Sequence, residues 1–198
     1  MLVVITGPSG VGKDTLLARL QERGHPQAGG AYHFIVTATT RPRRPDEREG
    51  VDYHFLSPQQ FDELLANDGL LESATVYGYR YGVPKAQVCE ALAQGKDVIV
   101  RTDVQGATYI KSICPQTVVI FLMPPSFQAL EERLRSRAAD EPEQVELRLT
   151  IAGEEMAAAS QFDHTVVNDN LEDTVAHIES IIAAEKLKPG REPISLQP

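Results

Sequence analysis

The stretch from Val3 to Leu16, VVITGPSGVGKDTL, decides the fold of this chain. Its first four residues favour β-structure, and they predict a short buried strand over 3–6. The next six residues, GPSGVG, include three glycines, which allow the backbone to turn sharply. An amphipathic run follows, and Gly24 ends it, so a helix is expected over 14–23. The order strand, glycine-rich loop, helix indicates an α/β fold.

The glycine-rich loop is predicted to bind phosphate. Backbone N–H groups in such a loop point toward one spot, and the following helix adds the positive end of its dipole there. Lys13 supplies a cation for the β- and γ-phosphates, so the loop matches the Walker A pattern. That pattern expects a Ser or Thr next, as a Mg²⁺ ligand, but Asp14 stands there. An ordinary glycine-rich turn is the alternative. The phosphate-binding residues expected are Gly7, Pro8, Ser9, Gly10, Val11, Gly12, Lys13, Asp14 and Thr15.

Composition limits the classes of protein to which the chain can belong. With 198 residues, 42% of them hydrophobic, it can bury a substantial core as one domain with inserted subdomains. A net charge of −9 argues against non-specific binding to nucleic acid or an anionic membrane, and we expect the basic residues to gather in a pocket. Two distant cysteines, no apolar run of membrane-spanning length and no room for a signal peptide before the first strand predict a reducing, cytoplasmic location.

The remaining elements are expected to alternate between strands and helices. Strands are predicted at 32–38, 51–56, 97–102, 117–123 and 165–168, with two more between 70 and 83 that turn near Gly78. Helices are predicted to begin at Pro58 and to run over about 85–94, 126–137, 142–160 and 171–186. This pattern predicts a three-layer α/β domain with a mostly parallel sheet. Residues 39–84 break the alternation, which indicates an inserted, mainly β subdomain with an exposed functional loop at 39–50.

Seven motifs in order resemble those of the guanylate kinase family of P-loop nucleoside monophosphate kinases. They are GPSGVGK, TTRPRR, EGVDYHF, LLES with YGYRYGVP, DVQGA, RLRSR with Arg148, and NDNLED. The resemblance covers nearly the whole chain. It implies a monomer or homodimer that transfers the γ-phosphoryl of ATP, with Mg²⁺, to GMP or dGMP in purine nucleotide metabolism. It also implies a core at about 1–35, 87–123 and 161–198, a GMP-binding subdomain at about 36–86 and a lid at about 124–160.

Arginines in the TTRPRR loop are expected to bind a phosphate. Prolines stiffen this loop, so the guanidinium groups of Arg41 and Arg44 can converge on one phosphate with bidentate geometry. The resemblance assigns to them the phosphate of GMP, together with the hydroxyls of Tyr53 and Tyr81. Arg43 stands where the family usually has proline, so which two of the three arginines face the phosphate is open. The alternative is a solvated basic loop neutralised by its own acidic residues.

A buried carboxylate is expected to select guanine. Guanine presents two adjacent donors that one carboxylate can accept together, and adenine does not. Glu72 matches the family's guanine-reading glutamate, and Asp103 matches its second carboxylate. Val83 stands where the family commonly has a Ser or Thr that donates to guanine, and Thr37 could partly compensate. Without the resemblance, Glu72 would more often be a solvated strand residue.

The predicted lid carries three arginines. Arg133 and Arg137 are four residues apart and so lie on one helical face, from which a closing helix could carry them, with Arg148, onto the transferring phosphates. Their alternative role is to pair with neighbouring glutamates. Asn168 matches a family position near adenine and is expected to bind ATP. The catalytic residues expected are Lys13, Arg41, Arg133, Arg137 and Arg148.

Two departures from the family occur at related positions. The family's strand usually carries an Asp that helps to organise Mg²⁺ where this chain has Arg101, whereas the glycine-rich loop has gained Asp14. We expect the metal-directed carboxylate to have moved to Asp14, with Arg101 pairing with it or touching a phosphate. The alternative is that Asp14 only complements the helix dipole.

The same departures keep two other functions open. Ribose 1,5-bisphosphate phosphokinases share the Lys-Asp and Tyr-Gly-Val features and the missing strand aspartate, but they lack the TTR and DYHF signatures present here. A catalytically silent guanylate-kinase-like binding module is the second alternative. Such a module would not need Lys13 or the lid arginines.

Overall fold

The structure is a computed structural model that describes residues 1–24, 32–136, 142–190, 194 and 196. Its central sheet is parallel, with the strand order β2-β7-β1-β8-β9. The strands of this sheet are β1 (Leu2–Thr6), β2 (His33–Phe34), β7 (Val98–Arg101), β8 (Val118–Met123) and β9 (His164–Val167). The helices that cover it are α1 (Lys13–Arg23), α3 (Lys85–Ala93), α4 (Val104–Ile113) and α7 (Leu171–Lys186).

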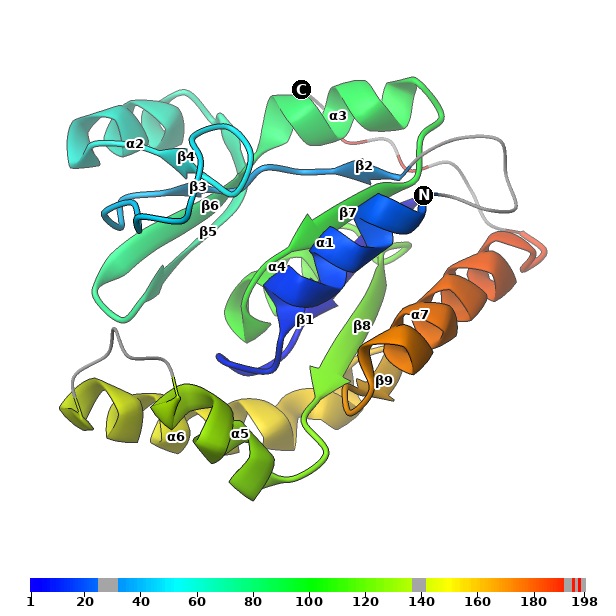
Figure 1. Cartoon of the computed structure of the whole chain (residues 1–198). Helices are drawn as coiled ribbons and strands as arrows, with labels where there is room; N and C mark the ends of the chain where they lie inside the picture. Colours follow the sequence, from blue (N-terminus) through cyan, green and yellow to red (C-terminus); the bar gives the residue numbers. More distant parts are fainter. Residues whose placement is uncertain (25–31, 137–141, 191–193, 195, 197–198) are drawn as a thin grey trace.

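Alternate residues of the strands face two separate cores. Val3 and Ile5 of β1 pack with α1 and α7 on one face of the sheet, whereas Leu2 and Val4 pack with α3 and α4 on the other. All four of these side chains are fully buried. A strand that is covered on both faces needs a continuous apolar sequence, and β1 has one. The predicted three-layer α/β fold is confirmed (Figure 1).

A second, mixed sheet is inserted between β2 and α3. Its strand order is β4-β3-β6-β5, from β3 (Ala38–Thr39), β4 (His54–Phe55), β5 (Leu70–Val76) and β6 (Tyr79–Pro84). The helix α2 (Pro58–Ala66) begins at Ser57, which forms a capping box with Gln60, as the Ser-Pro signal predicts. The inserted, mainly β subdomain is therefore confirmed. In Figure 1 it extends to one side of the central sheet.

Between β8 and β9, the described residues form two helices and a 3₁₀ turn. They are α5 (Phe127–Arg135), α6 (Pro142–Ala157) and η1 (Ala158–Gln161). Ser126 caps α5 by accepting a hydrogen bond from the N–H of Ala129 at 3.0 Å. Leu130 and Leu134 of α5 pack with apolar residues of α6 in a core cluster of their own. In Figure 1 these helices lie below the tip of the β5–β6 hairpin.

Two expectations from the sequence were wrong in detail, and one helix was missed. The run 32–38 forms two strands in different sheets, β2 and β3, because the chain leaves the central sheet there and Val36 bonds to the side chain of Gln87 on α3. The strand expected at 51–56 is limited to β4, since its partner β3 is equally short and residues 50–53 form a turn closed by Gly50 N–H and Tyr53 O. The helix α4 was not predicted at all.

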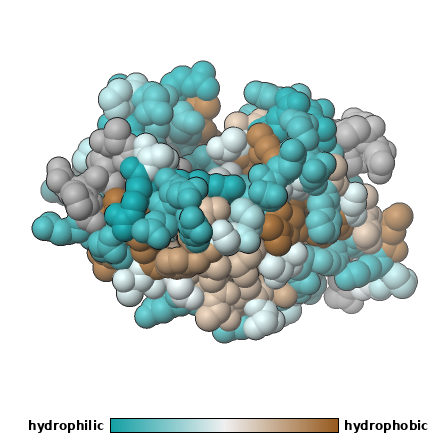
Figure 2. Space-filling model, turned by 60° about the horizontal axis from the view of Figure 1, so that its bottom comes forward, coloured by the Kyte–Doolittle hydropathy of each residue, from teal (hydrophilic) through white to brown (hydrophobic). Residues whose placement is uncertain are grey.

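The surface in view in Figure 2 is covered largely by hydrophilic residues, with hydrophobic ones between them. Among the helices of the described ranges, none combines the length and the apolar composition that a membrane span requires.

Candidate active site

A pocket of about 300 Å³ lies between the glycine-rich loop, the second sheet and helix α6. Among the described residues, five cationic side chains line it: Lys13, Arg41, Arg44, Arg101 and Arg148. Three acidic side chains also line it: Asp14, Asp103 and Glu155. The expectation that an acidic chain gathers its basic residues in a pocket is confirmed, and such a pocket suits phosphorylated ligands.

The glycine-rich loop has the backbone of an anion-binding turn. Gly7, Gly10 and Gly12 have φ values of 138°, 83° and 102°, which residues with a Cβ rarely adopt. Lys13 folds back over the loop, and its ammonium group donates to the carbonyl of Gly7 and, at 3.1 Å, to that of Pro8. Burial lowers the pKa of Lys13. The loop is therefore preformed, with a cation held at its mouth.

Not every predicted loop residue faces the pocket. Pro8, Val11 and Thr15 are absent from its lining within the described residues. Val11 is fully buried, and its carbonyl accepts hydrogen bonds from Asn168 Nδ2 at 2.7 Å and from Arg133 Nη1 at 3.2 Å. Asn168 and Arg133 thus support the loop from behind.

Arg41 and Arg44 line the pocket on the side of the second sheet, whereas Arg43 is exposed and outside the lining. Arg41 pairs with Glu47 at 2.6 Å, and Arg44 approaches the same carboxylate at 4.0 Å. The Arg41 guanidinium carbon also lies 5.4 Å from the centroid of the Tyr53 ring. The two arginines share one acceptor, as they would share a phosphate.

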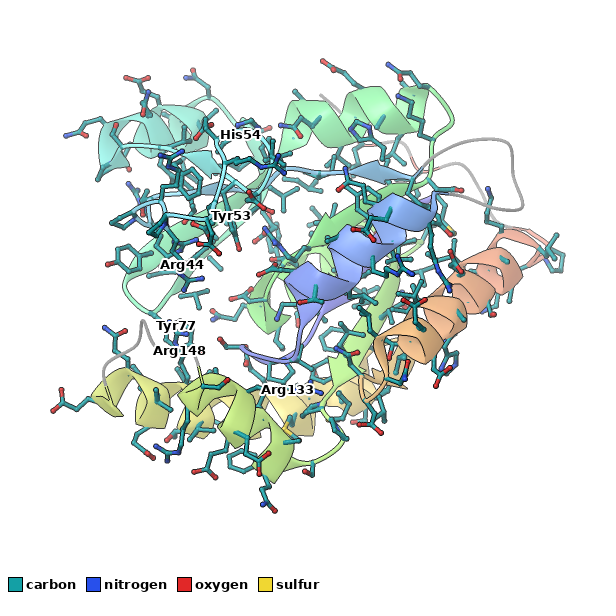
Figure 3. All side chains as sticks on the ribbon, viewed as in Figure 1. Arg44, Tyr53, His54, Tyr77, Arg133 and Arg148 are labelled. Atoms are coloured by element: carbon teal, nitrogen blue, oxygen red, sulfur yellow. The ribbon has the colours of Figure 1, made fainter. Side chains whose placement is uncertain are left out.

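Tyr53 and Tyr81 both line the pocket beside these arginines, with their ring centroids 6.1 Å apart. Burial raises the pKa of Tyr53 to about 12, so its hydroxyl is a hydrogen-bond donor at neutral pH. The residues expected to bind the GMP phosphate therefore line the same pocket, and Figure 3 shows two of them, Arg44 and Tyr53, on the side of the second sheet.

Glu72 is buried next to the pocket instead of being solvated. Its side chain accepts a hydrogen bond from the Thr102 hydroxyl at 2.9 Å, and its second carboxylate oxygen is buried with no hydrogen-bond partner among the described residues. Burial raises the pKa of Glu72 to about 7, the bond from Thr102 opposes that shift, and nearby Asp103 adds to it. Glu72 does not belong to the pocket lining within the described residues, but Thr102, which bonds to it, does.

Of the other residues expected near guanine, Asp103 and Thr37 line the pocket, whereas Val83 does not within the described residues. Asp103 lines the pocket and caps α4, where its Oδ1 accepts a hydrogen bond from Gly106 N–H at 2.8 Å; burial raises its pKa. Thr37 also lines the pocket, and its hydroxyl donates to the carbonyl of Arg101 at 3.3 Å. Val83 is fully buried in the apolar core and does not belong to the lining within the described residues.

Arg101 joins the two sides of the pocket. Its guanidinium pairs with Asp14 of the loop, donates to the carbonyl of Asp52 at 3.1 Å, and lies 4.4 Å from the centroid of the Tyr53 ring. The predicted pair between Arg101 and Asp14 is confirmed. The Asp14 side chain keeps 61% of its surface exposed, so it remains accessible from the pocket.

The lid arginines do not share one environment. Arg148 on α6 lines the pocket, and its guanidinium carbon lies 4.9 Å from the centroid of the Tyr77 ring. Arg133 on α5 instead donates to the carbonyls of Val11 and Asn168, and no ion pair joins it to a glutamate within the part of the chain that the structure describes. Figure 3 shows Arg148 beside Tyr77 and Arg133 apart from them. Arg137 lies outside the described residues.

Comparison with known proteins gives the same assignment as the motifs. The family model described as guanylate kinase matches residues 1–185. The chain belongs to the guanylate kinase family. It is 45% identical over 191 residues to the guanylate kinase of Carboxydothermus hydrogenoformans, which covers 96% of this chain and 91% of that protein. It is 50% identical over 184 residues to the guanylate kinase of Gloeobacter violaceus, with coverage of 93% and 87%.

A solved structure of the guanylate kinase family has the same fold. The crystal structure of guanylate kinase from Anaplasma phagocytophilum superposes with a TM-score of 0.78 at 30% identity, covering 96% of this chain and 88% of that one. The predicted P-loop fold is confirmed, and neither of the two alternative functions is favoured.

Sequence reasoning missed several residues that line the pocket of this guanylate kinase family member: Val76, Tyr77, Tyr79, Thr102, Gln144, Leu147 and Glu155. Tyr77 lies at the tip of the β5–β6 hairpin, where only the following glycine had been read as a signal. Glu155 lies seven residues after Arg148 on α6, hence on the same face of the helix, and this spacing could have revealed it. Burial raises the pKa of Glu155, while Lys13 and the backbone N–H of Ser9 oppose that shift.

Proposed function

We propose that the chain binds ATP and GMP end to end in this pocket and transfers the γ-phosphoryl group from one to the other. As a guanylate kinase, it is an ATP:GMP phosphotransferase. The proposed placement of the substrates is based on one observation. The anion-binding loop with Lys13 and the paired arginines Arg41 and Arg44 open on the same pocket from opposite sides. Two phosphate-binding sites that face each other are what in-line phosphoryl transfer requires.

The donor side is assigned to the glycine-rich loop. We assign the phosphates of ATP to the loop backbone over 7–12, to Lys13 and to the start of α1 at Asp14 and Thr15. Asn168 and Arg133 act on this side by fixing the carbonyl of Val11, so that the loop amides keep their direction. The proposed contact of Asn168 with adenine would be made at the same edge of the loop.

The acceptor side is assigned to the second sheet and the end of β7. Arg41, Arg44, Tyr53 and Tyr81 take the phosphate of GMP, where Arg41 exchanges Glu47 for the ligand. Guanine is read by Glu72 with Asp103, and Thr37 supplies the hydroxyl that Val83 lacks. Because Val83 is apolar and buried, selection of guanine over other bases rests mainly on Glu72.

The chemistry requires positioning and charge neutralisation more than proton transfer. Charge spreads over the equatorial oxygens of the transferring group, and fixed cations around it lower the barrier. We assign this role to Lys13, Arg41 and Arg148, which line the pocket. Arg133 and Arg137 join them when the lid closes.

The carboxylates of the site suit Mg²⁺ only together with the phosphates of a bound nucleotide. The described residues hold no group of three or more His, Cys, Asp or Glu side chains that could bind a metal by themselves. Mg²⁺ in kinases uses one or two carboxylates, water and substrate phosphates, and the accessible Asp14 supplies one such carboxylate. When bound, the ion would neutralise charge on the β- and γ-phosphates.

Closure of the pocket follows from the need to exclude water. We propose that segments 36–86 and 124–160 move onto a core made of 1–35, 87–123 and 161–198 when both substrates bind. Leu130 and Leu134 of α5 pack with apolar residues of α6, so the two helices would move together, and the hydrogen bonds of Arg133 to Val11 and Asn168 would have to rearrange.

A coupled assay of ADP formation tests the proposal. The acceptors are GMP, dGMP, AMP and ribose 1,5-bisphosphate, each with ATP and Mg²⁺. We expect turnover with GMP or dGMP and little with AMP. Turnover with ribose 1,5-bisphosphate alone, or no ADP with any acceptor, would reject the proposed function.

A further inference from the structure

Tyr77 adopts a backbone conformation that tyrosine disfavours. The hairpin between β5 and β6 has a two-residue turn, Tyr77-Gly78, in which Val76 pairs with Tyr79. The φ angles are 51° at Tyr77 and 80° at Gly78, as in a type I′ turn. Asn or Gly adopts such a φ with little strain, whereas a bulky aromatic residue does so at a cost. Strain of this kind is common at functional sites, so the ring itself calls for an explanation.

The strained turn places the ring at the junction of three segments. The Arg148 guanidinium carbon of α6 lies 4.9 Å from the ring centroid, which is a cation–π distance. The side chain of Ser9, in the glycine-rich loop, lies close enough to the Tyr77 hydroxyl to lower its pKa. Tyr77, Arg148 and Ser9 all line the pocket, and Figure 3 shows Tyr77 and Arg148 together beneath the hairpin tip.

The surroundings keep the Tyr77 hydroxyl neutral. Its pKa is raised to about 12, mainly by burial and in part by the charge of Glu155, while Ser9 and the charge of Arg148 oppose this shift. The ring therefore presents an uncharged face to the guanidinium at any pH at which the protein works.

We propose that Tyr77 is a positioning residue that holds Arg148 over the reacting phosphates and joins the hairpin, the lid and the glycine-rich loop. This inference rests on the proposed function and on the role assigned there to Arg148. A guanidinium held against a ring has fewer accessible rotamers before the substrates bind, so less side-chain ordering is needed to reach the transition state. The same contact ties closure of the lid to the acceptor subdomain.

Replacement of Tyr77 by Asn separates positioning from folding. Tyr77→Asn keeps a residue suited to positive φ, so the hairpin should be as stable as in the wild type or more so. Loss of the ring should lower kcat with GMP by about 3- to 30-fold, while KM for GMP changes by less than about twofold. Tyr77→Phe keeps the ring and should retain kcat within about threefold. Tyr109→Leu is the control, because Tyr109 is exposed on α4 and outside the pocket lining.

A double-mutant cycle shows whether Tyr77 acts through Arg148. In an Arg148→Ala background, Tyr77→Asn should change kcat by less than about twofold, since the group that it positions is gone. Effects that multiply in the double variant would overturn the proposal. It would also be overturned by an unchanged kcat in Tyr77→Asn, or by a fall in kcat that follows a lower melting temperature. If the wild type makes no ADP with GMP, the proposed function fails before any variant is compared.

Discussion

The buried carboxyl of Glu72 should make GMP binding depend on pH. Guanine offers two donors, so it needs the ionised carboxylate, yet burial raises the pKa of Glu72 to about 7. The ionised fraction is then about one-tenth at pH 6 and about nine-tenths at pH 8. Through this group, affinity for GMP should increase about tenfold between the two pH values.

Stability of the fold should change in the opposite direction. Because the pKa of Glu72 is about 7 in the fold and 4.5 in an unperturbed chain, protonation of the carboxyl favours the folded state. This contribution is complete below pH 4.5 and is lost as the pH rises to about 7. It amounts to about 3 kcal/mol at about 1.4 kcal/mol per pH unit. With 4% of the residue exposed, solvent screens little of it.

Glu72→Gln, which cannot titrate, is the variant that tests both effects. Calorimetric titration with GMP at pH 6 and pH 8 should show about tenfold more pH dependence in the wild type than in the variant. The phosphate of GMP also titrates, with a second pKa of about 6, and the variant measures how much this titration alone changes the affinity for GMP. At pH 8 the variant should bind GMP about 5- to 150-fold more weakly, because its amide places a donor against a donor. Between pH 5 and pH 8, the free energy of unfolding measured in urea should fall by about 2 to 3 kcal/mol more in the wild type than in the variant.

Equal pH dependence of GMP affinity in both proteins would refute the assignment of Glu72 to guanine. Equal pH dependence of stability would refute the raised pKa. The two results are independent, so one can fail without the other.

Three further variants or conditions test other parts of the site. Asp14→Ala should lower the Mg²⁺-dependent kcat at least about tenfold with little change in ATP affinity. Asp62→Ala, which removes an exposed partner of Arg80, is the control and should leave kcat unchanged. A near-normal kcat in Asp14→Ala would reject the metal role. Gly106→Ala would put a methyl group 2.6 Å from Glu72 Oε2 and should weaken GMP binding about tenfold and the fold by about 1 to 3 kcal/mol, measured by calorimetry and urea unfolding. Small-angle scattering should show compaction when GMP and a non-hydrolysable ATP analogue are both added, and an unchanged radius of gyration would contradict closure of the lid.

Local sequence signals were sufficient for most of the fold. The helix predicted over 171–186 is α7, because Asn170 caps its start and its apolar residues recur at helical spacing. The strand, loop and helix at the beginning of the chain were likewise set by β-favouring residues and glycines. In the site, the pair between Arg101 and Asp14 could be anticipated because both residues departed from the family pattern at positions expected to meet near Mg²⁺.

Features that depend on distant partners were not predictable. The split of 32–38 between two sheets depends on Gln87, which lies about fifty residues later and bonds to Val36. Glu72 could be matched to the family, but its burial depends on Thr102 and on the close approach of Gly106. No spacing of charges could show that Arg133 binds the carbonyls of Val11 and Asn168 instead of a glutamate.

The ion pairs inside the pocket have a consequence for its response to salt. Arg41 and Arg101 already have carboxylate partners from the same chain, Glu47 and Asp14. A nucleotide phosphate that reaches these arginines takes the place of a tethered carboxylate and releases few dissolved anions. The affinity for nucleotides should therefore fall less steeply with ionic strength than is expected when five cations bind a polyanion. Nucleotide binding would then tolerate changes in the surrounding salt concentration.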